Sequence, residues 1–223
     1  MGELLEAKEL FPGVFSINGK LATENLVKGA KAYSEELVDA GSKEYRLWNP
    51  YRSKLSAAIM NGLKEMHIRR DSKVLYLGAA TGTTSSHISD IVGPNGIVYC
   101  IELSDRNMRQ LIKVCEKRKN ILPILADAGD SGKYEEYISG CDIIYQDVSS
   151  RDQSGILLEN SRFLKSGGYA YFIIKSQSID VGRKPSEIFE QELSKVSNVY
   201  ELVEKVTIEP YDELHMFAVL RKR

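Results

Sequence analysis

The chain has 223 residues, and its 30 lysines and arginines nearly balance its 31 aspartates and glutamates, giving a net charge of −1. That length fits one α/β domain with a small appendage. The balanced charge excludes a molecule-wide basic field, so nucleic-acid binding must come from a local patch or from a partner. No apolar run is long enough to span a membrane, and we expect no membrane contact.

The cysteines and histidines exclude other classes of site. Cys100, Cys115 and Cys141 lack CxxC spacing, and an odd number of cysteines without a signal peptide favours a reducing, cytoplasmic location. The three histidines lack the spacing of metal ligands, so we expect no metal.

The N-terminal region differs in character from the rest. Residues 14–23 alternate in polarity around Asn18 and Gly19, which is a strong hairpin signal. We predict a small β-rich region over residues 1–50 and a main domain over residues 51–223. Helical spacing of apolar residues then predicts a helix over 51–66.

A glycine turn follows this helix. An apolar run at 74–77 precedes the turn at 78–83, and a helix-like stretch at 84–91 comes next. Strand, glycine turn and helix in this order are typical of a βαβ unit that brings backbone N–H groups to a nucleotide-like cofactor. The turn alone is a weak signal, because many α/β proteins contain one.

Three further predicted strands each end at an acidic residue. The runs 96–101, 121–125 and 142–146 precede Glu102, Asp127 and Asp147. The carboxyl ends of parallel strands share one sheet edge, so these acids and the glycine turn describe one cleft. Each acid alone could be a helix N-cap, but together they favour a cofactor cleft.

The C-terminal third completes a sheet. We predict helices over 152–164 and 185–196, a strand over 169–174 that ends at Lys175, and an antiparallel pair of strands over 200–208 and 215–220. The predicted fold is α/β, a Rossmann-like sheet of seven strands with the last one reversed, as in class I S-adenosylmethionine-dependent methyltransferases.

The glycine spacing of the turn distinguishes between two possible cofactors, S-adenosylmethionine and NAD. Gly78, Ala80 and Gly82 replace the G-x-G-x-x-G of dinucleotide sites, which fits a turn that carries no pyrophosphate. S-adenosylmethionine has a ribose, an adenine and an amino-acid tail, and acidic strand ends suit its ribose, adenine and sulfonium. NAD is the alternative cofactor.

Seven short motifs carry a resemblance to a known family. They occupy residues 48–55, 76–84, 86–90, 92–96, 147–148, 152–153 and 209–211. They resemble those of fibrillarin in its archaeal, fibrillarin-like form, which lacks a glycine–arginine tail. The resemblance implies methyl transfer from S-adenosylmethionine to ribose 2′-hydroxyls of pre-rRNA and tRNA, as the catalytic subunit of a box C/D ribonucleoprotein. It also implies a box C/D guide RNA, a Nop-domain scaffold protein and a kink-turn-binding ribosomal-type protein as partners.

The glycine turn indicates Gly78 and Ala80 as cofactor contacts. The same resemblance implies further contacts at the turn and the strand ends, which are Thr83, Thr84, Glu102, Leu103, Asp127, Ala128, Asp147, Val148, Ser149 and Ser150. Two segments depart from the family's pattern: residues 129–132 replace a basic-His-Pro stretch, and the serines at 149–150 replace Ala-Gln.

RNA 2′-O-methyltransferases of this class use a Lys-Asp-Lys core, which the chain resembles at Lys54, Asp147 and Lys175. We expect Lys175 to act as general base on the ribose hydroxyl. Partial burial and the second cation Lys54 favour the neutral amine that a base requires, whereas Asp147 opposes it. His215 is the predicted fourth catalytic residue, with Glu213 as the alternative.

Two groups of basic residues could form rims that contact RNA. The first is Arg46, Arg52, Lys54, Arg69 and Arg70, and the second is Lys113, Lys117, Arg118 and Lys119. Charged runs on helices are usually solvated faces, so we predict that the chain alone binds RNA poorly. A small-molecule methyltransferase, a non-catalytic scaffold and an NAD-dependent oxidoreductase are the alternative functions.

Overall fold

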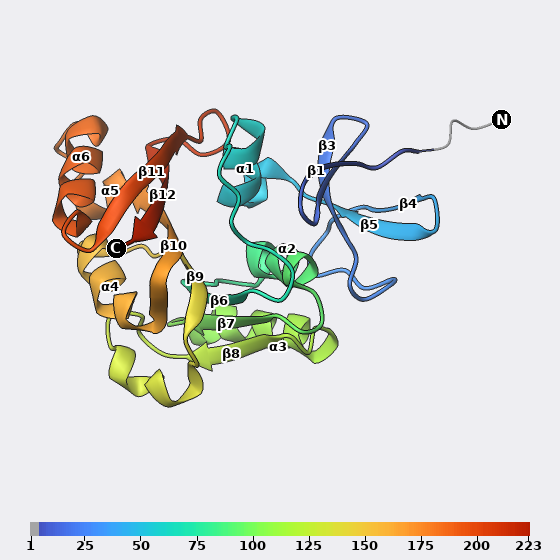
Figure 1. Ribbon diagram of the computed structural model, residues 1–223, viewed down its shortest axis with the longest axis horizontal. Coiled ribbons are helices and arrows are strands. Elements are labelled where there is room, and N and C mark those ends of the chain that lie inside the picture. The colour runs from blue at the N-terminus through green and yellow to red at the C-terminus, as the bar shows by residue number, and fades with distance from the viewer. Residues whose placement is uncertain (1–4) are drawn as a thin grey trace.

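The computed structural model describes residues 5–223, which form two β-sheets side by side (Figure 1). A smaller antiparallel sheet lies beside the helices α1 (Lys54–Met60) and α2 (Thr83–Val92), and the larger sheet carries helices on both faces. Within residues 5–223, the helices are all too short or too polar to cross a membrane.

The smaller sheet has five strands in the order β1-β2-β3-β5-β4. Their bounds are Lys8–Phe11, Val14–Ile17, Lys20–Glu24, Leu37–Ala40 and Lys43–Leu47 for β1 to β5. Strands β2 and β3 form the predicted hairpin, and Asn18 and Gly19 at its tip both have positive φ, as a type I′ turn requires. The sequence pattern did not predict β1, β4 or β5.

The larger sheet has seven strands in the order β11-β12-β10-β9-β6-β7-β8. Strands β6 to β12 span Lys73–Leu77, Ile97–Glu102, Ile121–Leu125, Cys141–Gln146, Leu164–Lys175, Tyr200–Thr207 and His215–Lys222. Strands β6 to β10 pair in parallel, and β12 runs antiparallel between β10 and β11. The predicted Rossmann-like sheet with a reversed strand is therefore confirmed.

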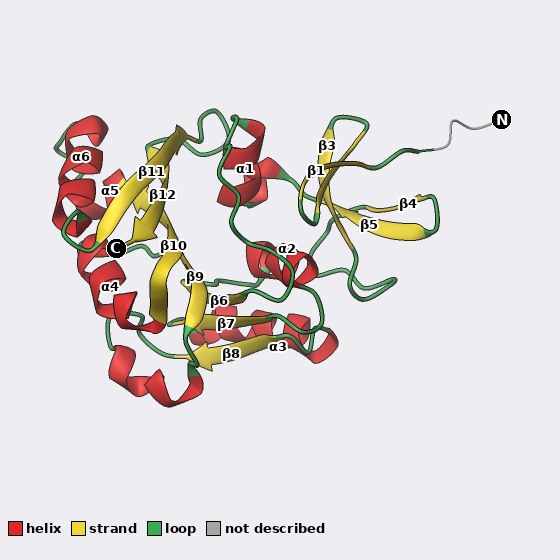
Figure 2. Cartoon of the chain, in the orientation of Figure 1, coloured by secondary structure: helices red, strands yellow, loops and turns green. Residues whose placement is uncertain are grey.

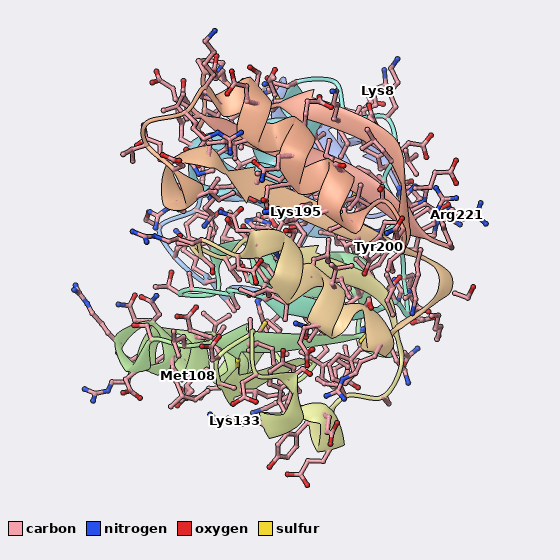
Figure 3. All side chains as sticks on the ribbon, turned by 90° about the vertical axis from the view of Figure 1, so that its left-hand side faces the viewer. Lys8, Met108, Lys133, Lys195, Tyr200 and Arg221 are labelled. Atoms are coloured by element: carbon pink, nitrogen blue, oxygen red, sulfur yellow. The ribbon has the colours of Figure 1, made fainter. Side chains whose placement is uncertain are left out.

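Helices cover both faces of this sheet (Figure 2). Helices α1, α2 and α3 (Asp105–Lys117) share one core with Tyr76 of β6, whereas α4 (Gln153–Asn160), α5 (Ser176–Ile179) and α6 (Pro185–Val196) share the other with Leu75 and Leu77. Figure 3 views the side of α4 and α6, with Lys195 labelled on α6 and Tyr200 at the start of β11. Burial of both faces explains why the predicted strands are nearly continuous apolar runs.

Two predicted helices are shorter than expected. Over residues 51–66 the chain forms a 3₁₀ turn at Pro50–Arg52 and then α1, because Ser53 is extended and caps α1 through its side chain. Helix α1 stops before Gly62, whose φ of +90° breaks the helix. The second helix, predicted over 152–164, ends at Asn160 in α4, and its last residues form a 3₁₀ turn and the start of β10.

A buried ionic network joins the smaller sheet to helix α2 and to the end of α3. Arg46 of β5 pairs with Glu35 at 2.6 Å and with Asp90 of α2 at 2.7 Å, and Arg118 also pairs with Asp90. These four side chains are at most 2% exposed. Arg46 and Arg118 are therefore structural residues, and the prediction that they belong to rims that contact RNA is wrong.

Candidate active site

Lys54 is the first residue of α1, and it lies between two carboxylates. Its Nζ is 3.2 Å from Asp147 Oδ2 and 3.4 Å from Asp212 Oδ2. Burial is the largest single influence and disfavours the charged amine, but the two carboxylates together outweigh it and raise the pKa of Lys54. Lys54 is therefore a positioned ammonium at neutral pH.

Asp147 and Lys175 meet at the carboxyl edge of the larger sheet, where neighbouring parallel strands β9 and β10 end. Lys175 Nζ lies 2.8 Å from Asp147 Oδ1 and donates hydrogen bonds to the Asp147 carbonyl at 3.0 Å and to Ser149 Oγ at 3.1 Å. Asp147 Oδ1 is buried and receives no well-aligned hydrogen bond within the described chain. Its contact with Lys175 is therefore an ion pair, because the ammonium aims its hydrogen bonds at the other two oxygens. The structure thus brings the predicted Lys-Asp-Lys core together from three elements.

Gln153, which is fully buried at the start of α4, fixes the end of β10. Its Oε1 accepts from the Lys175 N–H at 2.9 Å, and its Nε2 donates to the Lys175 carbonyl at 3.0 Å. Both backbone groups of Lys175 are therefore held by one side chain. The motif at 152–153 marked this residue, but the sequence did not indicate its positioning role.

Asp212 is a residue of the ionic core that sequence reasoning missed. It lies between β11 and β12, and it bridges Lys54 to His215, whose Nδ1 is 2.9 Å from Asp212 Oδ1. His215 stands opposite Lys175 in the β10–β12 register and also bonds the Glu213 carbonyl through Nδ1 at 2.6 Å. The motif at 209–211 directly precedes Asp212 and was the available signal. The catalytic role of His215 stays a prediction.

A cavity of about 470 Å³ opens beside this core. Its lining contains every predicted cofactor contact except Thr83 and Thr84. It adds the polar residues Ser104, Asn107 and Lys175 and the apolar residues Ile101, Ala126 and Ile156. Thr84 is buried and donates instead to Ser53 Oγ at 3.0 Å, and Thr83 begins α2. The structure does not bring these two threonines to the cavity. The role of the lining residues in cofactor binding stays a prediction.

The glycine turn and Glu102 fix each other on one side of the cavity. Glu102 Oε2 accepts from the Ala80 N–H at 2.7 Å, and Oε1 accepts from Ser104 N–H at 2.8 Å and from Asn107 Nδ2 at 3.3 Å. These bonds use about three of the four lone-pair sites of a carboxylate. A Cβ on Gly78 would meet the Asp147 carbonyl oxygen at 2.7 Å, so only glycine allows the turn to approach β9 this closely.

Other residues of the cavity lining combine exposed polar and apolar groups. Asp127 is exposed, and its Oδ1 accepts from the Gly129 N–H at 2.8 Å. Leu103 is 68% exposed, which is unusual for leucine and leaves an apolar surface at the cavity wall. Residues 5–223 contain no group of three or more His, Cys, Asp or Glu residues placed to hold a metal ion.

Arg69 and Arg70 do not lie on this edge. They line a separate cavity with Ser72 and Asp142, next to the amino ends of β6 and β9. Parallel strands place their two ends at opposite edges of the sheet, so the prediction that these arginines share a rim with Lys54 is wrong.

Comparisons with known proteins agree with this geometry. A model of the fibrillarin family matches residues 5–223. The fibrillarin-like rRNA/tRNA 2′-O-methyltransferase of Thermococcus onnurineus is 46% identical over 221 residues, covering 96% of this chain and 98% of that protein. Aeropyrum pernix fibrillarin in complex with natively bound S-adenosyl-L-methionine superposes with a TM-score of 0.90 at 39% identity, covering 97% of each chain.

A fibrillarin solved in a fibrillarin/Nop5p complex superposes with a TM-score of 0.89 at 35% identity, and the match covers 97% of this chain and 100% of that chain. The likeness therefore spans both sheets and the site at the carboxyl edge of the larger sheet. The chain belongs to the fibrillarin family.

Proposed function

We propose that this protein transfers a methyl group from S-adenosylmethionine to ribose 2′-hydroxyls of pre-rRNA and tRNA, as the guide-directed catalytic subunit of a box C/D ribonucleoprotein. The observation that carries the proposal is the carboxylate of Asp147, held between Lys54 and Lys175 at the edge of the cavity. Its fibrillarin relatives, named as rRNA/tRNA 2′-O-methyltransferases, support the same reaction.

The cavity fits S-adenosylmethionine better than NAD. A volume of about 470 Å³ lies within the range of small-ligand sites. Three carboxylates line it, at Glu102, Asp127 and Asp147, against the single lysine Lys175. Such a lining repels a pyrophosphate and attracts a sulfonium and an ammonium.

Two of these carboxylates each have capacity for one part of that cofactor. Glu102 keeps about one lone-pair site for a ribose hydroxyl after its three protein bonds. Asp127 Oδ2 can accept from the adenine amino group, and Leu103 offers an apolar surface to the ring. When bound, S-adenosylmethionine supplies an electrophilic methyl group on a cationic sulfur.

The chain's own residues would orient the ribose hydroxyl and take its proton. Lys175, fixed by Gln153 and Asp147, is the proposed general base, and Lys54 holds the other oxygen of Asp147. General base catalysis typically contributes about 10²- to 10⁴-fold. Most of the remaining acceleration would come from holding the two substrates in line.

The partners are part of the proposal. The solved fibrillarin/Nop5p complex supports a Nop-domain scaffold protein. A guide RNA is consistent with the near-neutral charge of the chain. The guide selects the target by base pairing, so the chain needs no molecule-wide basic field to recruit the substrate RNA. The kink-turn-binding ribosomal-type protein rests on the family resemblance.

A reducing compartment such as the cytoplasm is proposed for the same enzyme. All three cysteines are free, and burial raises the pKa of the thiols of Cys100 and Cys141. Thiols of this kind behave as small core residues with no disulfide role.

The test is methyl transfer from labelled S-adenosylmethionine to a target RNA, in a particle with a matching guide and both proposed protein partners. We expect methylation at the single guided ribose and a fall of about 10²- to 10⁴-fold in Lys175→Ala. Lys165→Ala is the matched control, because Lys165 lies at the other end of β10 and pairs with Asp142 at the surface.

Two outcomes would contradict the proposal. Cofactor binding without transfer would support a non-catalytic scaffold or a small-molecule methyltransferase. Guided transfer that Lys175→Ala leaves within twofold of the parent, with the fold intact by circular dichroism, would remove the general base role.

A further inference from the structure

A second hollow, the basic groove, lies between α3, the glycine turn and the segment that leads into β4. It has a volume of about 670 Å³, and Lys31, Arg52, Lys113 and Lys117 line it beside Thr81. Glu116 is the one carboxylate among the lining residues. Arg52 and the two α3 lysines are far apart in the sequence, and the fold brings them to one surface.

These four cations have no anionic partner within residues 5–223. No salt bridge of the described chain involves Lys31, Arg52, Lys113 or Lys117, whereas the neighbouring Arg118 is buried against Asp90. The charge that complements the groove must therefore come from solvent ions or from a bound molecule.

Arg52 is held in place at the groove. Its guanidinium lies 5.0 Å from the centre of the Tyr33 ring, and it donates to Ser34 Oγ at 3.3 Å. Tyr33 is itself anchored, because its hydroxyl hydrogen-bonds to the buried His87 at 2.7 Å. Arg52 also lies two residues before Lys54, so the groove begins close to the catalytic core.

Helix α3 extends the positive surface from the cofactor cavity to the groove. Arg106, Arg109, Lys113 and Lys117 are spaced by three or four residues, so they share one helix face. All four are exposed, whereas Met108 and Leu111 on the opposite face are buried. The stripe spans about 17 Å at a rise of 1.5 Å per residue, and it starts where Ser104 and Asn107 line the cavity.

We propose that the basic groove and the α3 stripe bind the sugar-phosphate backbone of the RNA strand next to the ribose that is methylated. This inference rests on the proposed function, since it assigns a surface to the same substrate. Regularly spaced, unpaired cations suit phosphate contacts, which position nucleic acid without reading its sequence.

An acidic protein surface fits the groove less well. Protein interfaces have an apolar or aromatic core inside a polar rim. The groove has three apolar lining residues: Val114 is buried, the small Ala32 is half-buried, and Tyr33 is half-buried and covered by Arg52. The surface therefore offers charge without an apolar centre, which is the composition of a backbone-binding site.

The test compares two double variants in the assembled particle with guide RNA and both protein partners. Lys113→Gln/Lys117→Gln removes two groove cations, and Lys8→Gln/Lys64→Gln removes two exposed lysines that lie outside the groove and form no ion pair in the described chain. The measured quantity is kcat/KM for the substrate RNA at several salt concentrations.

We expect the groove variant to lower kcat/KM about tenfold at low salt. A plot of log kcat/KM against log salt concentration should have a slope that is shallower than that of the parent by about 1.4 to 1.8. This difference corresponds to roughly 0.7 to 0.9 for each lost phosphate contact. The control variant should match the parent in both quantities, and S-adenosylmethionine affinity should be the same in all three proteins.

A photocrosslinker in place of Gln110, which also lines the groove, identifies the occupant directly. Crosslinks to the substrate strand are expected, and crosslinks to a protein partner alone would overturn the proposal. Equal kcat/KM and salt dependence in groove and control variants would overturn it as well. Failure of the proposed function is distinguishable, because the parent particle would then not methylate the guided ribose at all.

Discussion

Two ionic networks of similar composition have different surroundings in this protein. Arg46, Asp90 and Arg118, with Glu35, join the smaller sheet to α2 and the end of α3 through side chains that are at most 2% exposed. Lys54, Asp147 and Lys175 form a like chain at the sheet edge, but with exposures of 13 to 19% beside an open cavity.

The difference shows which network can take part in chemistry. In the buried network Arg46 also donates to the Ser86 carbonyl at 3.2 Å and to Ser86 Oγ at 2.9 Å, and Arg118 donates to Asn25 Oδ1 at 2.9 Å. Such a closed set of partners suits a structural role. The edge network instead uses lysines, which are compact charges on flexible stems that can exchange protons.

The largest effect is expected when the buried network loses a cation. Arg46→Met leaves the carboxylates of Glu35 and Asp90 buried without their shared partner, so the free energy of unfolding should fall by about 3–5 kcal/mol. Thermal unfolding should detect this as a melting temperature lower by roughly 10 °C.

Lys43→Met is the matched control for that experiment. Lys43 lies on the same strand and pairs with Glu24 at 2.7 Å, but both side chains are about half exposed. Its loss should change the free energy of unfolding by less than about 1 kcal/mol. Equal effects of the two substitutions would contradict the distinction between a buried structural network and surface pairs.

A smaller effect is expected from His87, which touches the buried network. Thr23 Oγ1 donates to Asp90 Oδ2 at 2.7 Å, so His87 Nδ1–H donates to Thr23 at 2.8 Å and Nε2 accepts from Tyr33. The neutral ring is thus fully satisfied. Burial, with Arg46 and Arg118 nearby, holds the pKa of His87 well below 6.5.

The direction of the pH effect follows from linkage. Below about pH 6.5 the unfolded chain binds a proton at this histidine and the folded chain does not. The free energy of unfolding therefore decreases as the pH is lowered, by about 1.4 kcal/mol for each pH unit. Between about pH 6.5 and 5, His87→Gln should remove the one-proton contribution of this histidine from the slope of the free energy of unfolding against pH. Urea denaturation at several pH values measures that slope. The hydrogen bonds that the substitution removes lower the stability by the same amount at every pH, so they do not change the slope. A slope unchanged by the substitution would sink the prediction.

The fold could be predicted where one signal dominates locally. The parallel sheet could be predicted because its buried strands are continuous apolar runs, four of them followed by the glycine turn at 78–83 or by an acidic residue. Strands β4 and β5 gave no such signal: only Ala40, Tyr45 and Arg46 in them are buried, and Arg46 is a charged residue inside the structure. Propensity cannot indicate a buried arginine whose partners lie 11 and 44 residues away.

The site was predictable to the same degree. Residues on strand ends were located well, since topology places those ends together. Thr84 was misplaced because a side chain in the first turn of a helix can face either the ligand or the core, and here it bonds Ser53. Asp212 was missed because it is carried by a loop between two strands, whose path depends on tertiary packing.

The smallest expected effect therefore tests Asp212, which only the structure assigned to the edge network. In Asp212→Asn, Lys54 keeps Asp147 but loses its second carboxylate, so the pKa of Lys54 falls from its raised value. Protonated Lys54 then persists over a narrower range, and the alkaline decline of guided methylation should begin at lower pH. At pH 7 the rate should change by less than about tenfold, since one pKa unit corresponds to about 1.4 kcal/mol.

The rate–pH profile between pH 7 and 10 measures this shift, with Glu213→Gln as the control. Glu213 is the adjacent exposed carboxylate, and the same change of charge there should leave the profile as it is, because no ion pair of the described chain involves its side chain. A shifted profile in Glu213→Gln and an unshifted one in Asp212→Asn would reverse the assignment, placing Glu213 in the edge network and leaving Asp212 as a surface residue.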